Sequence, residues 1–373
     1  MKLLYCGFNG FKQIPHENII ISKLSTVNLH CLQESEDLNI SKKQIENITR
    51  IEIFLHWSYN VLIINNNIYK LGYCNSSQKS LNQKLRINNN NQVTDIFCKD
   101  DVLILLDSDK NVFAYKNNSE YELETVSKIH YNKYVTNNVP CKSEVVQYLC
   151  AGHFLTAIVS LDNNLYKTPK EARASVDGTV IDISSGFEHT LLLTAEGKVY
   201  SWGVGSRGQL GHGEISNERF PRLVEALDGI QISKISAGGW HSCAVGILGE
   251  LYTWGWNEKG QLGLPIPKSS LKSLQKSIAT ETDSFNAMFT PKLITFIDNE
   301  FEVFQISSGN RHTVILGNDM KLYGTGWNKY KQLGIEDTSD VILQFCEIPS
   351  TGFILTKDIK LKCGPWSTAL IVK

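Results

Sequence analysis

The chain has 373 residues, of which 42% are hydrophobic and 20% are charged. This composition is typical of a soluble globular protein with a sizeable core, and it excludes disorder as the main state. With 37 basic and 38 acidic residues the formal net charge is −1, so no overall field draws the chain to nucleic acid or to an anionic membrane.

The same features predict a compartment. No stretch approaches the roughly 18 apolar residues of a membrane span, and the opening "MKLLYCGFNGFKQI" is interrupted by glycine and asparagine. Nine cysteines without CxxC spacing are typical of reduced thiols. We therefore expect a protein of the nucleus and cytoplasm that is not secreted, contacts no membrane and is monomeric on its own.

The N-terminal segment "LLYCGFNGFKQI" places Gly7, Phe8, Asn9 and Gln13 with the spacing of the second half of a motif that is complete further along. Weaker hairpins follow it, each with an apolar run, a turn of Asn, Asp or Lys residues, and a second run. These hairpins are expected at 61–72, 102–115 and 156–168.

The motif is then written three times without a gap, from Gly186, Gly238 and Gly309. Nine of 29 aligned positions are identical in all three copies, where chance predicts well under about one. Each copy predicts a β-hairpin. The residues that mark the motif are Gly186, His189, Trp202, Gly203, Gln209, Gly238, His241, Trp254, Gly255, Gln261, Gly309, His312, Gly326, Trp327, Gln332 and Gly364.

Repeats of this length are typical of propeller blades, because one small sheet cannot bury both faces alone and must stack on its neighbours. The C-terminal "LKCGPWSTALIVK" starts the motif at Gly364 and stops where the hairpin turn belongs. Residues 1–14 and 361–373 are therefore expected to share one blade. The sequence predicts an all-β fold: a seven-bladed β-propeller, one domain over 1–373, closed by pairing of its N- and C-terminal strands.

Departures from the repeat predict where specific function lies. The interval from Gly152 to Gly186 is too short for a complete four-stranded blade, so "YKTPKEARASVDG" (166–178) is expected as a connection. The stretch 264–292 is expected as a surface insertion. The candidate partner-binding residues in these two segments are Lys170, Arg173, Lys268, Lys272 and Lys276.

The recurring histidines and tryptophans have two interpretations each. Imidazole is a common zinc ligand, but positions related by rotation around a ring lie too far apart to share one ion. We therefore expect His189, His241 and His312 to be structural, hydrogen-bonded inside their own blades. Tryptophans at 202, 254, 256 and 327 could form a binding surface, but inter-blade packing is the favoured interpretation.

Catalytic motifs are absent. "GVGSRG" (203–208) superficially matches a phosphate loop, but it lies between strands and lacks the P-loop lysine. There is no HExxH, GxSxG or paired-carboxylate signature. The sequence predicts a protein that is not an enzyme, with no cofactor, no metal and no small-molecule substrate.

The string "SWGVGSRGQLGHG…AGGWHSCAV…LYTWGWNEKGQLGLP" resembles the repeat of the regulator of chromosome condensation family. The match is strong over 183–373 and the first dozen residues, and weak over 50–170. "CGF" at the start, "WSYN" at 57–60 and "CGPW" at 363–366 make the layout similar to a short, single-propeller member.

The resemblance implies two kinds of function. The founding member is a guanine-nucleotide exchange factor for the small GTPase Ran that docks on chromatin. The short member is instead a scaffold for a JmjC-type 2-oxoglutarate oxygenase, a histone demethylase or protein hydroxylase with a role in chromosome segregation. We expect a non-enzymatic, chromatin-associated scaffold for such an oxygenase, with histones as possible contacts. The alternative is an exchange factor for a Ran-like small GTPase.

Overall fold

The computed structural model describes most of the chain, and every structural statement below concerns these residues. They are 1–10, 12–34, 38, 40–72, 83–85, 92–98, 102–109, 112–116, 146–151, 156–160, 164–168, 171–264, 286–296, 298, 300–336, 339–350 and 352–372. Within them the regular structure is strand, apart from the helix α1 (Lys42–Glu46) and the 3-10 turns η1 (Leu29–Glu34) and η2 (Glu225–Leu227). Ser41 caps α1.

The strands in the described part of the chain form seven antiparallel sheets, six of four strands and one of three. The first has the order β2-β1-β27-β26, from Ile20–Thr26, Lys2–Phe8, Ser367–Val372 and Lys360–Cys363. The second is β3 to β6, at Ile51–Leu55, Tyr59–Ile64, Asn67–Gly72 and Gln83–Leu85. The third is β7 to β9, at Val93–Cys98, Val102–Asp107 and Val112–Lys116.

The other four sheets follow the chain in the same way, strand after strand. The fourth sheet is β10 to β13, at Val146–Ala151, Thr156–Ser160, Asn164–Thr168 and Glu171–Ser175. The fifth is β14 to β17, at Val180–Ser185, His189–Thr194, Val199–Gly203 and Glu218–Leu223. The sixth is β18 to β21, at Ile232–Ala237, His241–Gly246, Leu251–Trp256 and Ala287–Leu293. The seventh is β22 to β25, at Val303–Ser308, His312–Gly317, Leu322–Trp327 and Val341–Ile348.

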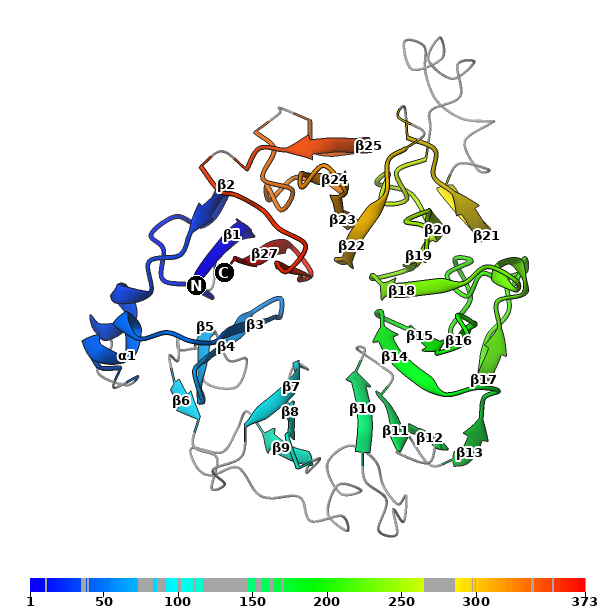
Figure 1. Cartoon of the computed structure of the whole chain (residues 1–373), viewed down its shortest axis with the longest axis horizontal. Helices are drawn as coiled ribbons and strands as arrows, with labels where there is room; N and C mark the ends of the chain where they lie inside the picture. The colour runs from blue at the N-terminus through cyan, green and yellow to red at the C-terminus, as the bar shows by residue number, and fades with distance from the viewer. Residues whose placement is uncertain are drawn as a thin grey trace.

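The sheets are arranged around a common centre (Figure 1). The innermost strand is the first of the four or three strands in each sheet, except in the sheet β2-β1-β27-β26, where it is β26. Neighbouring inner strands contact one another in the order β3, β7, β10, β14, β18, β22 and β26, and β26 also contacts β3. This arrangement is an all-β propeller, as the repeat predicts.

One sheet contains strands from both ends of the chain. β1 pairs with β27 in an unbroken register from Lys2 opposite Val372 to Gly7 opposite Ser367. The two ends lie side by side in Figure 1. The pairing of N- and C-terminal strands expected from the split motif is therefore present, and this sheet extends past residue 14 to include β2.

The sequence of β15, the second strand of the fifth sheet, is explained by burial on both faces. In β15, Leu191 and Leu193 pack in a cluster with residues of β18 and β19, while Leu192 packs on the opposite side with Val180 and Trp202. A strand that is buried on both faces has a continuous apolar run instead of alternation. The hydrophobic core is thus divided into layers between adjacent sheets.

The expectation for 166–178 is wrong, and the expected insertion 264–292 needs a correction at its C-terminal end, while its residues 265–285 lie outside the described residues. The short interval before Gly186 still holds a complete four-stranded sheet, because "EARAS" forms β13 and pairs with β12. The segment 166–178 is therefore mostly strand instead of a connecting loop. Residues 287–292 of the expected insertion belong to β21, which pairs with β20.

Candidate functional site

The repeated glycine and histidine form one structural unit in each of three sheets. Gly186 N–H donates to the carbonyl of His189, and a Cβ on Gly186 would lie 2.5 Å from Cε1 of the His189 ring. The glycine is therefore required because the imidazole occupies the space of a side chain. Gly238 with His241 and Gly309 with His312 repeat this arrangement.

From the sequence we expected the histidine rings to form hydrogen bonds inside their own sheets. This expectation is wrong, because each ring bonds to the next sheet. Nε2 of His189 lies 2.7 Å from Ser242 Oγ, in the next sheet. His241 reaches Thr313 Oγ1 at 2.9 Å, and His312 reaches Thr368 Oγ1 at 3.3 Å, again one sheet further on. Each ring therefore links two neighbouring sheets, because the inner ends of the sheets converge.

The hydroxyl groups at these links also fix the histidine tautomer. Ser242 Oγ donates its single proton to the carbonyl of Gln209 at 2.8 Å, so it can only accept from the imidazole. Nε2 of His189 is therefore the protonated nitrogen. Nδ1 of each of the three rings is buried without a hydrogen-bond partner.

Burial keeps all three imidazoles neutral. It lowers the pKa of His189 and of His241 to about 3, and that of His312 to about 4. A second proton would sit on Nδ1, where no acceptor meets it. The three rings serve three different sheet boundaries. No group of three His, Cys, Asp or Glu side chains able to hold a metal occurs among the described residues.

In three of the sheets, the repeated glutamine shapes the loop that follows the third strand, namely β16, β20 or β24. Gln209 Oε1 accepts from the backbone N–H of Arg207 at 2.8 Å, and Gln261 and Gln332 accept in the same way from Lys259 and Tyr330. All three glutamines are completely buried. They therefore fix the position of the loop residue two places before them.

The tryptophans fall into two groups. Trp202 and Trp254 are fully buried, and the Trp254 indole donates to the Gln209 carbonyl at 3.0 Å. Trp256 and Trp327 are only half-buried and lie with other aromatic side chains at one end of the central opening. Trp327 lines a cavity there, so inter-sheet packing does not describe its position.

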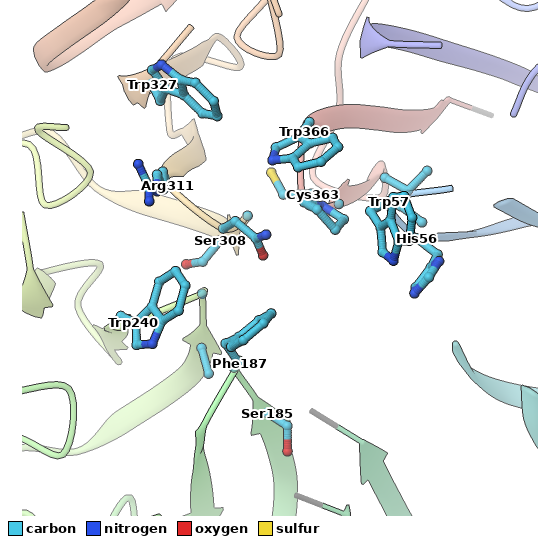
Figure 2. Close-up of a pocket in the computed structure, with 18 of the residues that line it drawn as sticks. His56, Trp57, Ser185, Phe187, Trp240, Ser308, Arg311, Trp327, Cys363 and Trp366 are labelled. Atoms are coloured by element: carbon cyan, nitrogen blue, oxygen red, sulfur yellow. The ribbon is translucent and has the colours of Figure 1, made fainter. Parts of the chain in front are cut away.

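That cavity, of about 740 Å³, lies where the inner strands end. Figure 2 shows the side chains around it, contributed by loops of several sheets. Its aromatic walls are Trp57, Phe187, Trp240, Trp327 and Trp366. Arg311 and His56 are the basic side chains of the wall, and no Asp or Glu is among the lining residues.

Two runs of ring contacts lie beside this cavity, one from Phe187 to Trp256 and one from Trp327 to Trp57. Phe187 and Trp240 have centroids 4.8 Å apart, and Trp240 and Trp256 lie edge to face at 5.4 Å. From Trp327, the second run passes through Tyr330 to Trp366, at 5.3 Å and 5.6 Å, and then to Trp57 at 6.4 Å.

Two arginines bridge the tryptophans of these two runs. The Arg207 guanidinium lies 5.4 Å from the Trp240 centroid and 4.1 Å from that of Trp256. Arg311 lies 4.8 Å from Trp256 and 5.7 Å from Trp327. We call the following set the aromatic–arginine arc: Phe187, Arg207, Trp240, Trp256, Arg311, Trp327, Tyr330, Trp366 and Trp57.

The arc was not anticipated from the sequence, although a signal for it exists. Three of its members, Phe187, Trp240 and Arg311, stand between the repeated glycine and histidine, and Trp366 has the same place after Gly364. These are the loop positions at which the copies differ. A comparison of the repeat copies that searches for identical residues does not detect these variable positions.

The structure places one of the five basic residues proposed from the sequence. Arg173 is in β13, and Lys170, Lys268, Lys272 and Lys276 lie outside the described residues. No helix in the described part of the chain is long and apolar enough to cross a membrane.

The propeller of small repeated sheets and its loop-built aromatic cavity define a repeat protein with the architecture of a binding module. The regulator of chromosome condensation (RCC1) repeat matches residues 196–245 and 249–316, and a second model of that repeat matches 180–209 and 232–261. Residues 180–316 of the chain therefore contain RCC1 repeats.

Two curated relatives and one solved structure extend this finding. RCC1 domain-containing protein 1 is 35% identical in mouse and 38% in human, each over 209 residues, which are 51% and 49% of this chain. The match spans 54% of either relative, so the chain covers about half of their length. Prp20p of Saccharomyces cerevisiae, solved in a study of its binding to Gsp1p and histones, has a TM-score of 0.73 at 15% identity. That match covers 99% of this chain and 90% of Prp20p.

Proposed function

We propose that this protein is a protein-binding scaffold without catalytic chemistry of its own, and that the aromatic–arginine arc is its partner-binding surface. The observation that supports this most is the concentration of half-buried aromatic side chains and arginine around one cavity. Tryptophan, tyrosine and arginine are the residues that dominate binding energy at protein interfaces.

The scaffold is rigid in this proposal. We infer that the seven sheets act as the seven blades of one closed ring over 1–373, with 1–14 and 361–373 sharing the closing blade and the stretch from 264 carrying a surface insertion. The pairing of β1 with β27 and the contacts of β26 with β3 support it. A rigid frame lowers the entropy cost of presenting loops to a partner.

The partner that we propose is a JmjC-type 2-oxoglutarate oxygenase, a histone demethylase or protein hydroxylase. The protein would then act in the nucleus and cytoplasm as a chromatin-associated cofactor in chromosome segregation. The similarity to RCC1 domain-containing protein 1 supports this choice. Exchange activity on a Ran-like small GTPase is the second candidate, supported by the likeness of the fold to Prp20p.

Affinity capture tests the scaffold function. We expect the tagged protein to retain a JmjC oxygenase in stoichiometric amount from nuclear extract after a moderate salt wash. If Ran is retained instead, in the absence of nucleotide and with release by GTP, the second candidate is correct. Accelerated release of mant-GDP from Ran separates the two, since only an exchange factor acts catalytically.

The lysines of the insertion make a separate prediction. Replacing Lys268, Lys272 and Lys276 with Glu is expected to weaken capture of the partner severalfold, because it reverses three charges in a segment that interrupts the repeat. The thermal midpoint is expected to stay unchanged. Undiminished capture would remove this segment from the binding surface and leave the arc as the proposed contact.

A further inference from the structure

The two arginines of the arc have no anionic partner among the residues that the structure describes. Ion pairs in the described residues use other cations, such as Arg222 with Glu214 and Lys321 with Glu347. No described carboxylate lies within 4.0 Å of the Arg207 or Arg311 guanidinium, and no hydrogen bond from either guanidinium is present among the described residues. The one arc-side acid, Glu188, instead accepts from the Trp240 indole at 2.8 Å.

The stacking prepares both guanidiniums for an anion. A guanidinium that lies over a ring contacts it through its planar face, while its N–H groups point outward in the plane. These edges form two parallel hydrogen bonds to a carboxylate. Both guanidiniums lie within 5 Å of the Trp256 ring centroid, that of Arg207 at 4.1 Å and that of Arg311 at 4.8 Å. The same ring therefore holds both cations before any ligand arrives.

The cavity beside Arg311 supplies the apolar half of the site. Among the described residues, its wall combines aromatic rings with Arg311 and His56 and includes no carboxylate. Figure 2 shows Trp57, Trp240, Trp327 and Trp366 around it. A volume of about 740 Å³ is within the range of pockets that enclose a whole small ligand. It therefore has room for one or two apolar side chains.

The arrangement favours a protein segment over a nucleic acid. Single-stranded nucleic acid binds to basic grooves in which bases stack on open aromatic faces. Here the ring of Trp256 is already in contact with two guanidiniums, and Trp240 and Trp327 each contact one. The basic groups are also few and lie in one short row, which suits carboxylates in a peptide better than a phosphate backbone.

We propose that the aromatic–arginine arc binds an acidic, extended segment of a partner protein, with carboxylates on Arg207 and Arg311 and an apolar side chain in the cavity. This inference rests on the proposed scaffold function and specifies the chemistry that the scaffold recognises. It places the contact in loops that the repeat holds rigidly through Gln209.

Fluorescence anisotropy with a defined probe tests the proposal. The probe is a fluorescein-labelled peptide Glu-Asp-Glu-Phe-Glu-Asp-Glu, compared with the same peptide carrying Lys at every acidic position and with a short oligothymidine. We expect binding of the acidic probe alone, weakened by salt. Replacing both Arg207→Ala and Arg311→Ala is expected to raise its Kd at least tenfold.

Two further variants keep the result interpretable. Arg219→Ala removes an arginine that also lies over a ring, that of Phe220 in β17, but away from the cavity; it is expected to leave the Kd within about twofold. Changing Arg207 and Arg311 to Lys keeps both charges and loses the paired hydrogen bonds, so an intermediate Kd is expected. Unchanged thermal midpoints show that the variants fold.

Several outcomes would overturn the proposal. They are equal binding of the Lys peptide or the oligonucleotide, no binding of the acidic probe, and full binding by the double Ala variant. If light scattering shows a dimer that the double Ala variant no longer forms, the occupant of the arc is a second copy of this chain. If wild-type and double-variant protein capture the same partner equally from extract, this inference fails and the scaffold function stands. If the wild type captures no protein, the scaffold function fails, while the peptide measurement still decides the specificity of the arc.

Discussion

Lowering the pH from 7 to 5 is expected to reduce the free energy of unfolding by about 4 kcal/mol. His189, His241 and His312 are the cause, because burial lowers their pKa to about 3, 3 and 4. Below the ordinary histidine pKa of about 6.5, the unfolded chain takes up a proton at each of the three and the folded protein does not. Stability is therefore complete above this pH and is lost as the pH falls.

One carboxyl group opposes this loss. Burial raises the pKa of Asp95 to about 6, so in this range the folded state binds a proton there that the unfolded state does not bind. Between pH 7 and pH 5, the three histidines lower the free energy of unfolding by roughly 5 to 6 kcal/mol, and Asp95 raises it by roughly 1 kcal/mol. The raised pKa of Asp182, also due to burial, acts in the same direction as Asp95.

Chemical denaturation at a series of pH values measures this effect. His241→Gln is expected to lower stability at pH 7, since the bond to Thr313 is lost, but also to reduce the pH slope by about one proton. A stability that stays flat from pH 7 to 5, or a slope unchanged in this variant, would contradict neutral buried imidazoles.

Gly255→Ala is expected to cost more than about 3 kcal/mol, an exceptional amount for one methyl group. Gly255 has φ +94°, and a Cβ there would lie 2.7 Å from the Trp240 carbonyl oxygen and 2.9 Å from Cα of His241. Both contacts are backbone atoms: His241 is the first residue of the paired strand β19, and Trp240 directly precedes it. This backbone cannot move without opening the sheet.

Gly229→Ala is the matched control. Gly229 has φ +85°, close to that of Gly255, but a Cβ there meets nothing within 4 Å. This substitution is expected to lower the free energy of unfolding by about 1 kcal/mol, because only the unfavourable positive φ contributes. Denaturant unfolding of both variants separates backbone strain from close approach. Equal losses would mean that the contact with β19 carries no energy.

The hairpins could be predicted from the sequence because their signals are local. Val102–Asp107 and Val112–Lys116 are two apolar runs around a polar turn, and they form β8 and β9. β13 was missed because Glu, Ala and Arg have little preference for strands. Its pairing with β12 is a tertiary effect that overrides this preference.

The candidate site was beyond prediction for a different reason. The motif made His241 visible, but its partner Thr313 lies 72 residues further along and is brought near only by stacking of the sheets. Arg207 and Arg311 stand at unrelated positions of the repeat, and both approach Trp256 only when the fifth, sixth and seventh sheets lie side by side. Local patterns contain no information on such distances.

The sheet that joins β1 to β27 also determines how the protein can be made. The sheet pairs Lys2–Phe8 with Ser367–Val372, so β1 has an unpaired edge until synthesis has passed residue 367. An exposed edge of apolar strand is a site for pairing with other chains. The growing chain is therefore most vulnerable to aggregation during synthesis, and the final pairing is a step of very high contact order. Shielding of the N-terminal strands by a chaperone on the ribosome is the expected requirement for efficient production.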